Sequence, residues 1–435
     1  VFEGTSWRAG LRRLMRGEAD PNDMRRLGER ADGLCYTPLS TDWHRRKGTR
    51  ERLLEIREKY PDRLHIELNA LATKVVFDSG NRAIGVEYLK GDRLYRAHHE
   101  PSIEPGERRE VRAAREVILA GGAFNTPQLL MLSGIGPREV LDKWRDYIPA
   151  VKVLEGVGQN LQDRYEVAIV YRMRKPWSSL RGAKFRRGDR LYEDWSGRRK
   201  DWHGRGGGMY TANGAAIAFS LRSSCGEPDP NLFCMALLAP FKGYYTGYSK
   251  DVCDPGRLDC LTWAVLKAYS GSRGSVTLES PDPRDRPKIN FRYFEETDAG
   301  SARKDVDAVL TAIKFIRKIT SRLKSQGLIG GEEEFPGEGP GFPGEGPAAD
   351  KELARHVRDT AWGHHASCTC RIGPESEGGV LSNDFKVHGT TGLRVVDASV
   401  FPRIPGFFIA SAIYMIAEKA ADVILREAEG DRDAK

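Results

Sequence analysis

The sequence predicts an α/β protein with a second domain built on a mostly antiparallel sheet. One observation is a strand at 393–396 that runs into Asp397 and then into the start of a helix. This arrangement is typical of an α/β domain that holds a cofactor at a helix N-terminus. The other is a series of strand-like stretches in the middle of the chain, without amphipathic helices between them. Such a series favours antiparallel pairing.

The first part of the chain predicts helices at both ends of a group of strands. Residues 1–60 are charged and mostly helical in pattern, and Thr49 caps the clearest helix, at 49–59. Strands are predicted at 64–77, 83–89 and 116–120, with a turn at 78–81 between the first two. A helix at 126–133 follows, with Pro127 in its first turn.

The rest of the chain predicts the second sheet and three more helices. Strand-like stretches lie at 165–174, 230–240, 261–269, 275–279 and 289–294. Residues 305–324 have apolar residues at helical spacing, which predicts a helix packed on a core. A Pro/Gly-rich stretch at 335–347 predicts an exposed loop, and further helices are expected at 351–359 and 413–425.

Composition indicates a globular protein long enough for two or three domains. Of its 435 residues, 40% are hydrophobic and 30% are charged. No run of about 18 apolar residues occurs, which excludes a transmembrane helix, and the polar start predicts a cytoplasmic protein without a signal peptide. The seven cysteines lack metal-site spacing, so we expect reduced thiols. A Cys253–Cys260 bridge is the alternative in an oxidising compartment.

The net charge of +8 is concentrated in one stretch, residues 172–205. Twelve Lys or Arg residues and four acids lie there, with aromatic residues between them. Our first interpretation is a solvated surface insertion. The alternative is a surface for an anionic substrate or partner; nucleic acid binding is a weaker hypothesis.

Four longer motifs point to one family. They are A-G-G-A-F-N-T-P-Q-L-L-M-L-S-G-I-G-P at 120–137, G-V-G-Q-N-L-Q-D at 156–163, S-R-G-S-V-T-L-E-S-P-D-P at 272–283, and a C-terminal stretch that begins G-H-H-A-S-C-T-C at 363 and continues through V-V-D-A-S-V-F-P. In this order they resemble the glucose–methanol–choline (GMC) flavoprotein oxidoreductases. Four long motifs in order are more specific than a lone glycine pattern.

The resemblance implies an FAD-binding domain of the GMC type and a substrate domain. The FAD-binding domain would be assembled from flanks 1–163 and 353–435, with the substrate domain at 164–352. The implied reaction is oxidation of a small alcohol, with hydride passing to FAD and the final electron acceptor left open. The family's N-terminal strand–turn–helix with G-x-G-x-x-G does not occur in this sequence. We therefore expect the N-terminal βαβ unit of a typical member to be missing.

The resemblance also assigns the active site. His365 matches the family histidine and would act as general base towards the substrate hydroxyl. His364 is expected to point elsewhere, because neighbours on an extended segment face opposite ways. Phe408 occupies a position that is usually His or Asn, and a phenyl ring neither accepts nor donates such a proton. Three readings stay open: a single-base enzyme, a substitute such as Ser411, Tyr414 or His364, or altered chemistry.

The cofactor residues follow from the same motifs. Asp397 and Ala398 match the positions that usually meet the ribityl–pyrophosphate region, although Asp397 could instead be only a helix cap. Ala72 matches the position whose backbone usually meets the adenine. The remaining candidates are Gly121, Gly122, Asn125, Thr126 and Ile409. Cys368 and Cys370 are interpreted as buried packing residues.

A second hypothesis comes from a different functional class. The chain could be a truncated or split, non-catalytic product that binds no flavin alone and presents its basic stretch as an interaction surface. Phe408 and the absent glycine loop both favour this alternative.

Overall fold

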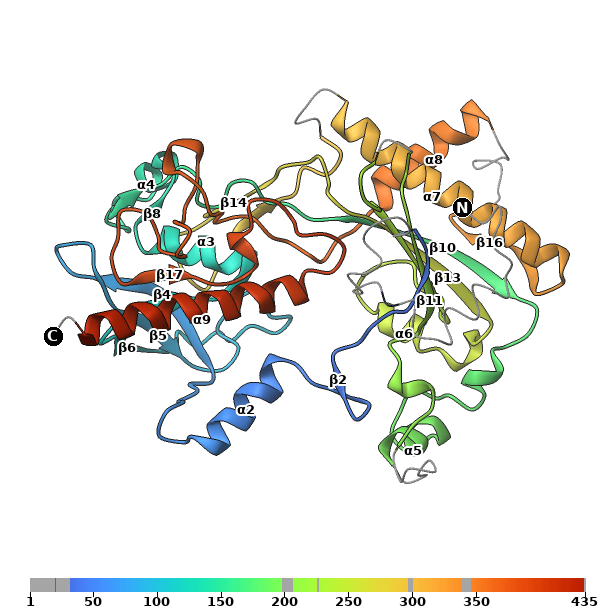
Figure 1. The fold of residues 1–435 in the computed structure, drawn as a ribbon, viewed down its shortest axis with the longest axis horizontal. Helices are drawn as coiled ribbons and strands as arrows, with labels where there is room; N and C mark the ends of the chain where they lie inside the picture. Colours follow the sequence, from blue (N-terminus) through green and yellow to red (C-terminus); the bar gives the residue numbers. More distant parts are fainter. Residues whose placement is uncertain are drawn as a thin grey trace. The chain divides into compact units, whose positions relative to one another are not determined.

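The computed structural model describes residue 20 and residues 32–197, 206–224, 227–295, 300–337 and 346–433. Contacts divide the chain into two compact units (Figure 1), the first comprising Val1–His65, Tyr165–Ala268 and Arg303–Trp362, and the second Ile66–Arg164, Tyr269–Ala302 and Gly363–Lys435. This grouping differs from the expected limits in three stretches and at Arg164, which belongs to the second unit. Residues 1–65 and 353–362 group with the sheet of the first unit, and residues 269–302 group with the second.

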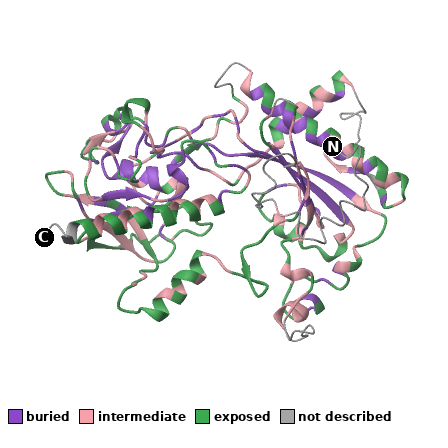
Figure 2. Cartoon of the chain, in the orientation of Figure 1, coloured by how far each residue is buried: buried purple, intermediate pink, exposed green. Residues whose placement is uncertain are grey.

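The first unit contains a six-stranded sheet in the order β1-β11-β12-β13-β10-β16. Every neighbouring pair is antiparallel, as expected for the second domain. The strands are β1 (Gly33–Cys35), β10 (Tyr165–Met173), β11 (Ala215–Leu221), β12 (Leu232–Leu237), β13 (Cys260–Lys267) and β16 (Ile329–Phe335). β13 is buried along its whole length, which explains its nearly continuous apolar sequence (Figure 2).

Helix α7 (Ser301–Ser325) supplies apolar residues to the core of the first unit. Val306, Val309, Ile313 and Ile316 are buried, as the helical spacing predicted. Phe315 of α7 meets Phe219 of β11 edge to face, with ring centroids 5.2 Å apart. Helix α8 (Pro347–Thr360) also buries one apolar stripe.

The smaller elements of the first unit only partly follow the prediction. The stretch before residue 49 contains β1, β2 (Thr41–Asp42) and β3 (Arg45–Arg46); the helical pattern expected at 1–19 and 21–31 lies outside the described residues. Helix α2 spans Thr49–Lys59 as expected, but Gly48 is its N-cap and Glu51 accepts the Gly48 N–H at 2.9 Å. Short helical segments complete the unit: α5 (Arg190–Ser196), α6 (Tyr248–Val252) and single turns at Ser178–Leu180, Met209–Thr211 and Pro255–Arg257.

The second unit combines an antiparallel meander with a parallel pair. The meander is β4 (Ala70–Phe77), β5 (Ala83–Lys90) and β6 (Glu107–Arg112). β4 begins at Ala70, six residues later than predicted. Its turn is as expected, because Asp78 Oδ1 accepts from the backbone N–H groups of Gly80 and Arg82, both at 2.9 Å. β7 (Val117–Leu119) pairs in parallel with β17 (Leu393–Val395), so segments from the two halves of the chain share one sheet.

Several short elements and one long helix complete the second unit. They are α4 (Arg138–Lys143), the parallel pair β8 (Ile135–Gly136) and β9 (Lys152–Val153), the hairpin β14 (Ser275–Thr277) and β15 (Lys288–Asn290), and turns at Glu375–Glu377 and Ala398–Val400. β15 ends four residues earlier than the predicted strand. Helix α9 spans Ala410–Asp433 and is longer than predicted at both ends.

Helix α3 (Gly122–Leu132) differs from the prediction in where it begins. It begins at Gly122, so Pro127 lies inside the helix and not in its first turn. Proline has no N–H to bond the carbonyl four residues earlier, that of Ala123. The Thr369 hydroxyl donates to the Ala123 carbonyl at 2.7 Å instead, and the Thr369 side chain is fully buried. A partner from the C-terminal part of the chain therefore replaces the bond that proline removes.

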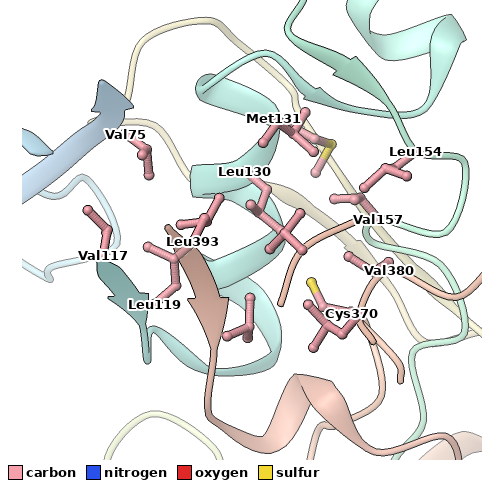
Figure 3. Packing of buried hydrophobic residues seen from close by; sticks show 14 of the residues in the cluster. Val75, Val117, Leu119, Leu130, Met131, Leu154, Val157, Cys370, Val380 and Leu393 are labelled. Atoms are coloured by element: carbon pink, nitrogen blue, oxygen red, sulfur yellow. The ribbon is translucent and has the colours of Figure 1, made fainter. Parts of the chain in front are cut away.

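The core of the second unit is made by both of its flanks. Val75, Val117, Leu119, Leu130 and Met131 from the first flank are buried there. Figure 3 shows them close to Leu393, Val380 and Cys370 of the second flank. Among the described residues, no helix combines the length and the apolar composition that crossing a membrane requires.

Candidate functional site

The segment that follows the histidine pair lies between the second motif and the stretch around Ala398. On one side, Ser367 and Gln162 exchange backbone hydrogen bonds of 2.9 and 3.1 Å, and Gly158 N–H donates to the Thr369 carbonyl at 2.8 Å. On the other side, Cys368 N–H donates to the Ala398 carbonyl at 3.0 Å. The structure therefore joins the second motif to the histidine pair, and the histidine pair to the later part of its own C-terminal motif.

Asp163 holds the backbone at the histidine pair. Its Oδ1 accepts from the N–H groups of Arg164 and His365 at 2.8 and 2.9 Å, and its Oδ2 accepts from the Tyr293 hydroxyl at 2.9 Å. Burial raises the pKa of this carboxyl group above its usual value, against the lowering effect of these bonds. Position 363 requires glycine, because a Cβ there would overlap the Asp163 carboxylate and the Tyr293 hydroxyl.

His365 lies against a buried guanidinium that the sequence did not predict. Arg164, whose exposed fraction is 0%, donates from Nε to His365 Nδ1 at 3.0 Å. Its Nη2 lies 3.4 Å from Nε2 of both His364 and His365, so the expectation that His364 points away from His365 was wrong. The only sequence signal was a basic residue directly after the L-Q-D of the second motif, at the start of an apolar strand.

Both imidazoles are biased towards their neutral form. Burial and then the charges of Arg164 and His364 lower the pKa of His365 to about 2. Burial and Arg164 also lower the pKa of His364, to about 4. Solvent screens this effect at His364, because that residue is exposed. His365 is therefore uncharged at neutral pH and has one ring nitrogen with a lone pair.

Phe408 is a neighbour of His365, as its place in the motif predicted. The two rings are 6.0 Å apart and nearly perpendicular, at 71°. The Arg164 guanidinium lies 4.8 Å from the centroid of the phenyl ring, within cation–π range. Phe408 is 45% exposed, whereas the adjacent Ile409 is buried and packs with Ile404. Ser411 and Tyr414, the alternative polar candidates, are exposed on the first turns of α9.

Asp397 joins the two strands of the parallel pair to α3. Its Oδ2 accepts from the Gly122 N–H at 2.9 Å and from the Thr126 hydroxyl at 2.6 Å, and its Oδ1 accepts from the Ser399 N–H at 2.7 Å. Thr126 Oγ1 in turn accepts from the Gly121 N–H at 2.9 Å. Gly121, Gly122, Thr126 and Asp397, four of the predicted cofactor residues, thus form one hydrogen-bonded cluster next to Ala398. The contacts within this cluster are of the kind that caps a helix.

Of the three remaining predicted cofactor residues, Ile409 is buried beside Phe408, and Asn125 and Ala72 lie on α3 and β4. Asn125 lines a cavity of about 670 Å³ with Phe124 and Tyr95. Ala72 lies in β4 opposite Tyr88 of β5, on a strand that Ser133 ties to α3 by accepting the Val75 N–H at 2.8 Å. Cys368 and Cys370 are fully buried, as expected, and burial raises the pKa of both thiols, that of Cys368 to about 12.

The Asp397 cluster fits the hydroxyl-bearing part of a flavin nucleotide better than its phosphates. Gly122 has φ +82°, and a Cβ there would meet no atom within 4 Å, so a ligand could approach this backbone closely. The Asp397 carboxylate accepts hydroxyl hydrogen bonds but repels phosphate. The amides of Gly121 and Gly122 already donate to Thr126 and Asp397. The phosphates therefore need donors other than these two.

The described part of the basic stretch is partly neutralised. Arg172 pairs with Asp259 at 2.7 Å and with Glu334 at 3.1 Å, and Arg190 lies 3.5 Å from Asp194. Residues 198–205, with four of the twelve cations, lie outside the described residues. A role for this stretch in binding an anionic partner stays a prediction.

Comparisons with known proteins agree with this architecture. The chain is 34% identical over 369 residues to an oxygen-dependent choline dehydrogenase of Staphylococcus aureus, a match that covers 83% of this chain and 56% of the relative. It superposes on an FAD-dependent oxidoreductase from Chaetomium thermophilum with a TM-score of 0.70 and 25% identity, over 91% of this chain and 68% of the other. For a formate oxidase the TM-score is 0.63 and the identity 26%, over 83% and 60%.

The chain spans little more than half the length of the curated relative that it matches. The family models cover most of this chain, however, and flank the central sheet strands. The N-terminal model of the GMC oxidoreductases matches residues 14–166, and the C-terminal model matches residues 270–417, which contain the histidine pair, Asp397 and Phe408. The cofactor of this fold is FAD. The chain belongs to the GMC family of flavoprotein oxidoreductases.

Proposed function

We propose that this chain carries the substrate-oxidising site of an FAD-dependent alcohol oxidoreductase, with His365 as the base that takes the hydroxyl proton. The observation that carries the proposal is the placement of His365, whose backbone N–H donates to Asp163 Oδ1 at 2.9 Å and whose ring lies beside the partly exposed Phe408. A general base must be unprotonated at the working pH and must lie within reach of the proton. When bound, FAD would accept the hydride from the carbon of the same alcohol.

The surroundings of His365 indicate the shape of the substrate. Phe408 presents a partly exposed ring beside the imidazole, so an apolar group next to the CH–OH carbon would find a packing surface there. Asp397, Thr126 and the backbone of Gly122 would face the sugar-like part of the cofactor. Ala398 and Ile409 are mainly buried and would contribute backbone and packing.

The test is flavin reduction by an alcohol in flavin-loaded protein, followed in a stopped-flow instrument. His365→Ala should slow reduction by roughly 10²–10⁴-fold while the flavin stays bound, because general-base catalysis contributes about that factor. His364→Ala should cost far less. His388→Ala is a matched control, since His388 belongs to the same unit and bonds the Gly373 carbonyl at 2.9 Å.

Phe408→Asn is the informative third variant. It restores a polar group at the position where the family usually has His or Asn. The rate of flavin reduction should rise only if Phe408 has removed a useful polar group, and not if Phe408 is an adaptation to apolar substrates. A crippling His364→Ala together with a nearly silent His365→Ala would move the base assignment to His364.

One observation favours the alternative of a chain that binds no flavin alone. The first two amides at the N-terminus of α3 are already bonded within the protein. On this view, the purified chain stays colourless after FAD has been added and the unbound FAD has been removed by dialysis. A yellow protein with flavin absorption bands supports the enzyme.

A further inference from the structure

We propose that Arg164 is a positioning residue that fixes the tautomer of His365, with the single ring proton at Nε2 and Nδ1 kept as the acceptor that the substrate hydroxyl must reach. The inference rests on the proposed function of His365, which it deepens by naming the nitrogen that acts. Arg164 was not among the residues that the motifs assigned to the site.

The direction of one hydrogen bond carries the argument. A guanidinium has five N–H donors, no acceptor, and keeps its proton in proteins. Arg164 Nε–H points to His365 Nδ1 at 3.0 Å, so Nδ1 must be the nitrogen with the lone pair. The neutral ring then carries its proton at Nε2. The Arg164 Nη2 to Nε2 distance of 3.4 Å is long for a hydrogen bond and does not reverse this assignment.

The two side chains are held in this relation by a shared anchor. Asp163 Oδ1 accepts the backbone N–H of Arg164 at 2.8 Å and that of His365 at 2.9 Å. The two residues are 201 positions apart in sequence, yet one carboxylate oxygen bonds the backbone N–H groups of both and fixes their positions. Phe408 packs against the guanidinium, with its ring centroid 4.8 Å away. A guanidinium held at its backbone and at its head group is well placed to orient a ring.

Other charged and titratable groups surround the pair. His364 lies beside His365, with ring centroids 4.4 Å apart, and Asp163 with Tyr293 lies at its backbone. Burial lowers the pKa of His365 first, and the charges of Arg164 and His364 lower it further.

Arg164 already donates to His365 Nδ1, so the proposed reaction requires a change of hydrogen-bond partner at this nitrogen. A substrate hydroxyl must take the place of the Arg164 Nε–H at this nitrogen before the proton can move from the hydroxyl oxygen to Nδ1. The displaced guanidinium then stays beside the oxygen that loses its proton, where a fixed positive charge is most useful. Arg164 would therefore orient the base at rest and stabilise the oxygen during proton transfer.

The experiment reads the ring directly and needs no turnover. Two-bond nitrogen–proton correlation spectra of the ¹⁵N-histidine-labelled chain distinguish the Nε2–H from the Nδ1–H tautomer, and a His365→Asn sample assigns the signal. In the unaltered chain we expect His365 as the Nε2–H form throughout the range pH 6–8. In Arg164→Met we expect a mixture of tautomers and a titration midpoint that moves upward, because one cause of the lowered pKa is removed while burial remains.

Two further variants separate the possible outcomes. Arg164→Lys keeps a positive charge without the planar fork, so the midpoint should stay low while the tautomer preference weakens. Arg273→Met is a matched control, because Arg273 bonds the Ser270 and Ser272 carbonyl groups and should leave His365 unchanged. A folded Arg164→Met protein with an unchanged tautomer and midpoint would overturn the proposal and leave Arg164 a structural residue. If Arg164→Met does not fold, Arg164→Lys decides, and a tautomer preference as strong as in the unaltered chain would then overturn the proposal.

The two proposals can fail separately. Fast flavin reduction in His365→Ala would remove the base role and leave the tautomer result standing. An unchanged His365 spectrum in the Arg164 variants would remove the positioning role of Arg164, whatever the kinetics of His365→Ala.

Discussion

At the scale of single residues, buried carboxylates organise the second unit by collecting donors from distant segments. Asp163, at the end of the second motif, accepts from Arg164, from His365 and from Tyr293. Asp397 accepts from α3 and from its own turn. A buried acceptor that satisfies several donors is costly to remove, because each donor then loses its partner away from water.

Asp397→Ala should therefore destabilise the second unit by roughly 3 kcal/mol or more, since hydrogen bonds to charged groups contribute about 1.5–3 kcal/mol each and are not fully additive. Asp397→Asn should cost less, because one amide oxygen still accepts. The measurement is urea unfolding followed by circular dichroism. Asp384→Ala, on the exposed surface of the same unit, serves as the control. An Asp397→Ala chain as stable as the control would mean that the cluster contributes little to the fold.

At the scale of elements, α3 shows how a helix tolerates an interior proline. Pro127 leaves the Ala123 carbonyl without its usual helical donor, and the buried Thr369 hydroxyl supplies one. The same bond attaches the histidine motif to the helix whose N-terminus carries the candidate cofactor residues. The proline and the threonine should thus be energetically coupled.

Thr369→Val should cost about 1–3 kcal/mol, the usual penalty for a buried carbonyl that loses its donor. Pro127→Ala restores an N–H at the right place, so the double variant should lose less stability than the two single changes predict. A double-mutant cycle on urea unfolding measures this coupling. Thr390→Val is the control, because Thr390 bonds the Val387 carbonyl at a partly exposed site. Strictly additive effects would show that the two residues act independently.

At the scale of the whole molecule, the second unit is assembled from three segments of the chain. Its parallel pair joins residues 117–119 to residues 393–395, and its core draws on both flanks. Within the described residues, however, no strand–turn–helix carries a glycine-rich phosphate loop. A helix N-terminus with free amides is the usual site for a dinucleotide's phosphates.

We therefore expect the 435-residue chain on its own to retain little FAD. Visible absorption and equilibrium dialysis with FAD measure the stoichiometry. Addition in trans of a glycine-loop segment from a full-length family member should raise retention, and a segment with its loop glycines changed to alanine is the control. One FAD per chain without any addition would contradict this expectation.

The sequence by itself determined the family and the antiparallel character of the central sheet, of which it predicted β10, β12 and β13 but not β1, β11 and β16. Apolar residues at helical spacing identified α7, because a burial pattern of this kind depends on few distant contacts. The motifs also placed Phe408 next to His365 and grouped Gly122, Thr126 and Asp397 in a common role. In these cases the information lies in residue types at fixed spacing.

Only the tertiary structure decided what surrounds those residues. Arg164 reaches His365 across 201 positions of sequence, and Thr369 completes a helix 246 positions before it. Neither pairing has a local signal, because an arginine after a motif and a threonine within one fit many environments equally well. The start of α3 was mispredicted for the same reason: the usual rule puts proline in the first turn, and a distant hydroxyl made an interior proline acceptable. Chemistry at this site therefore depends on partners that chain packing alone selects.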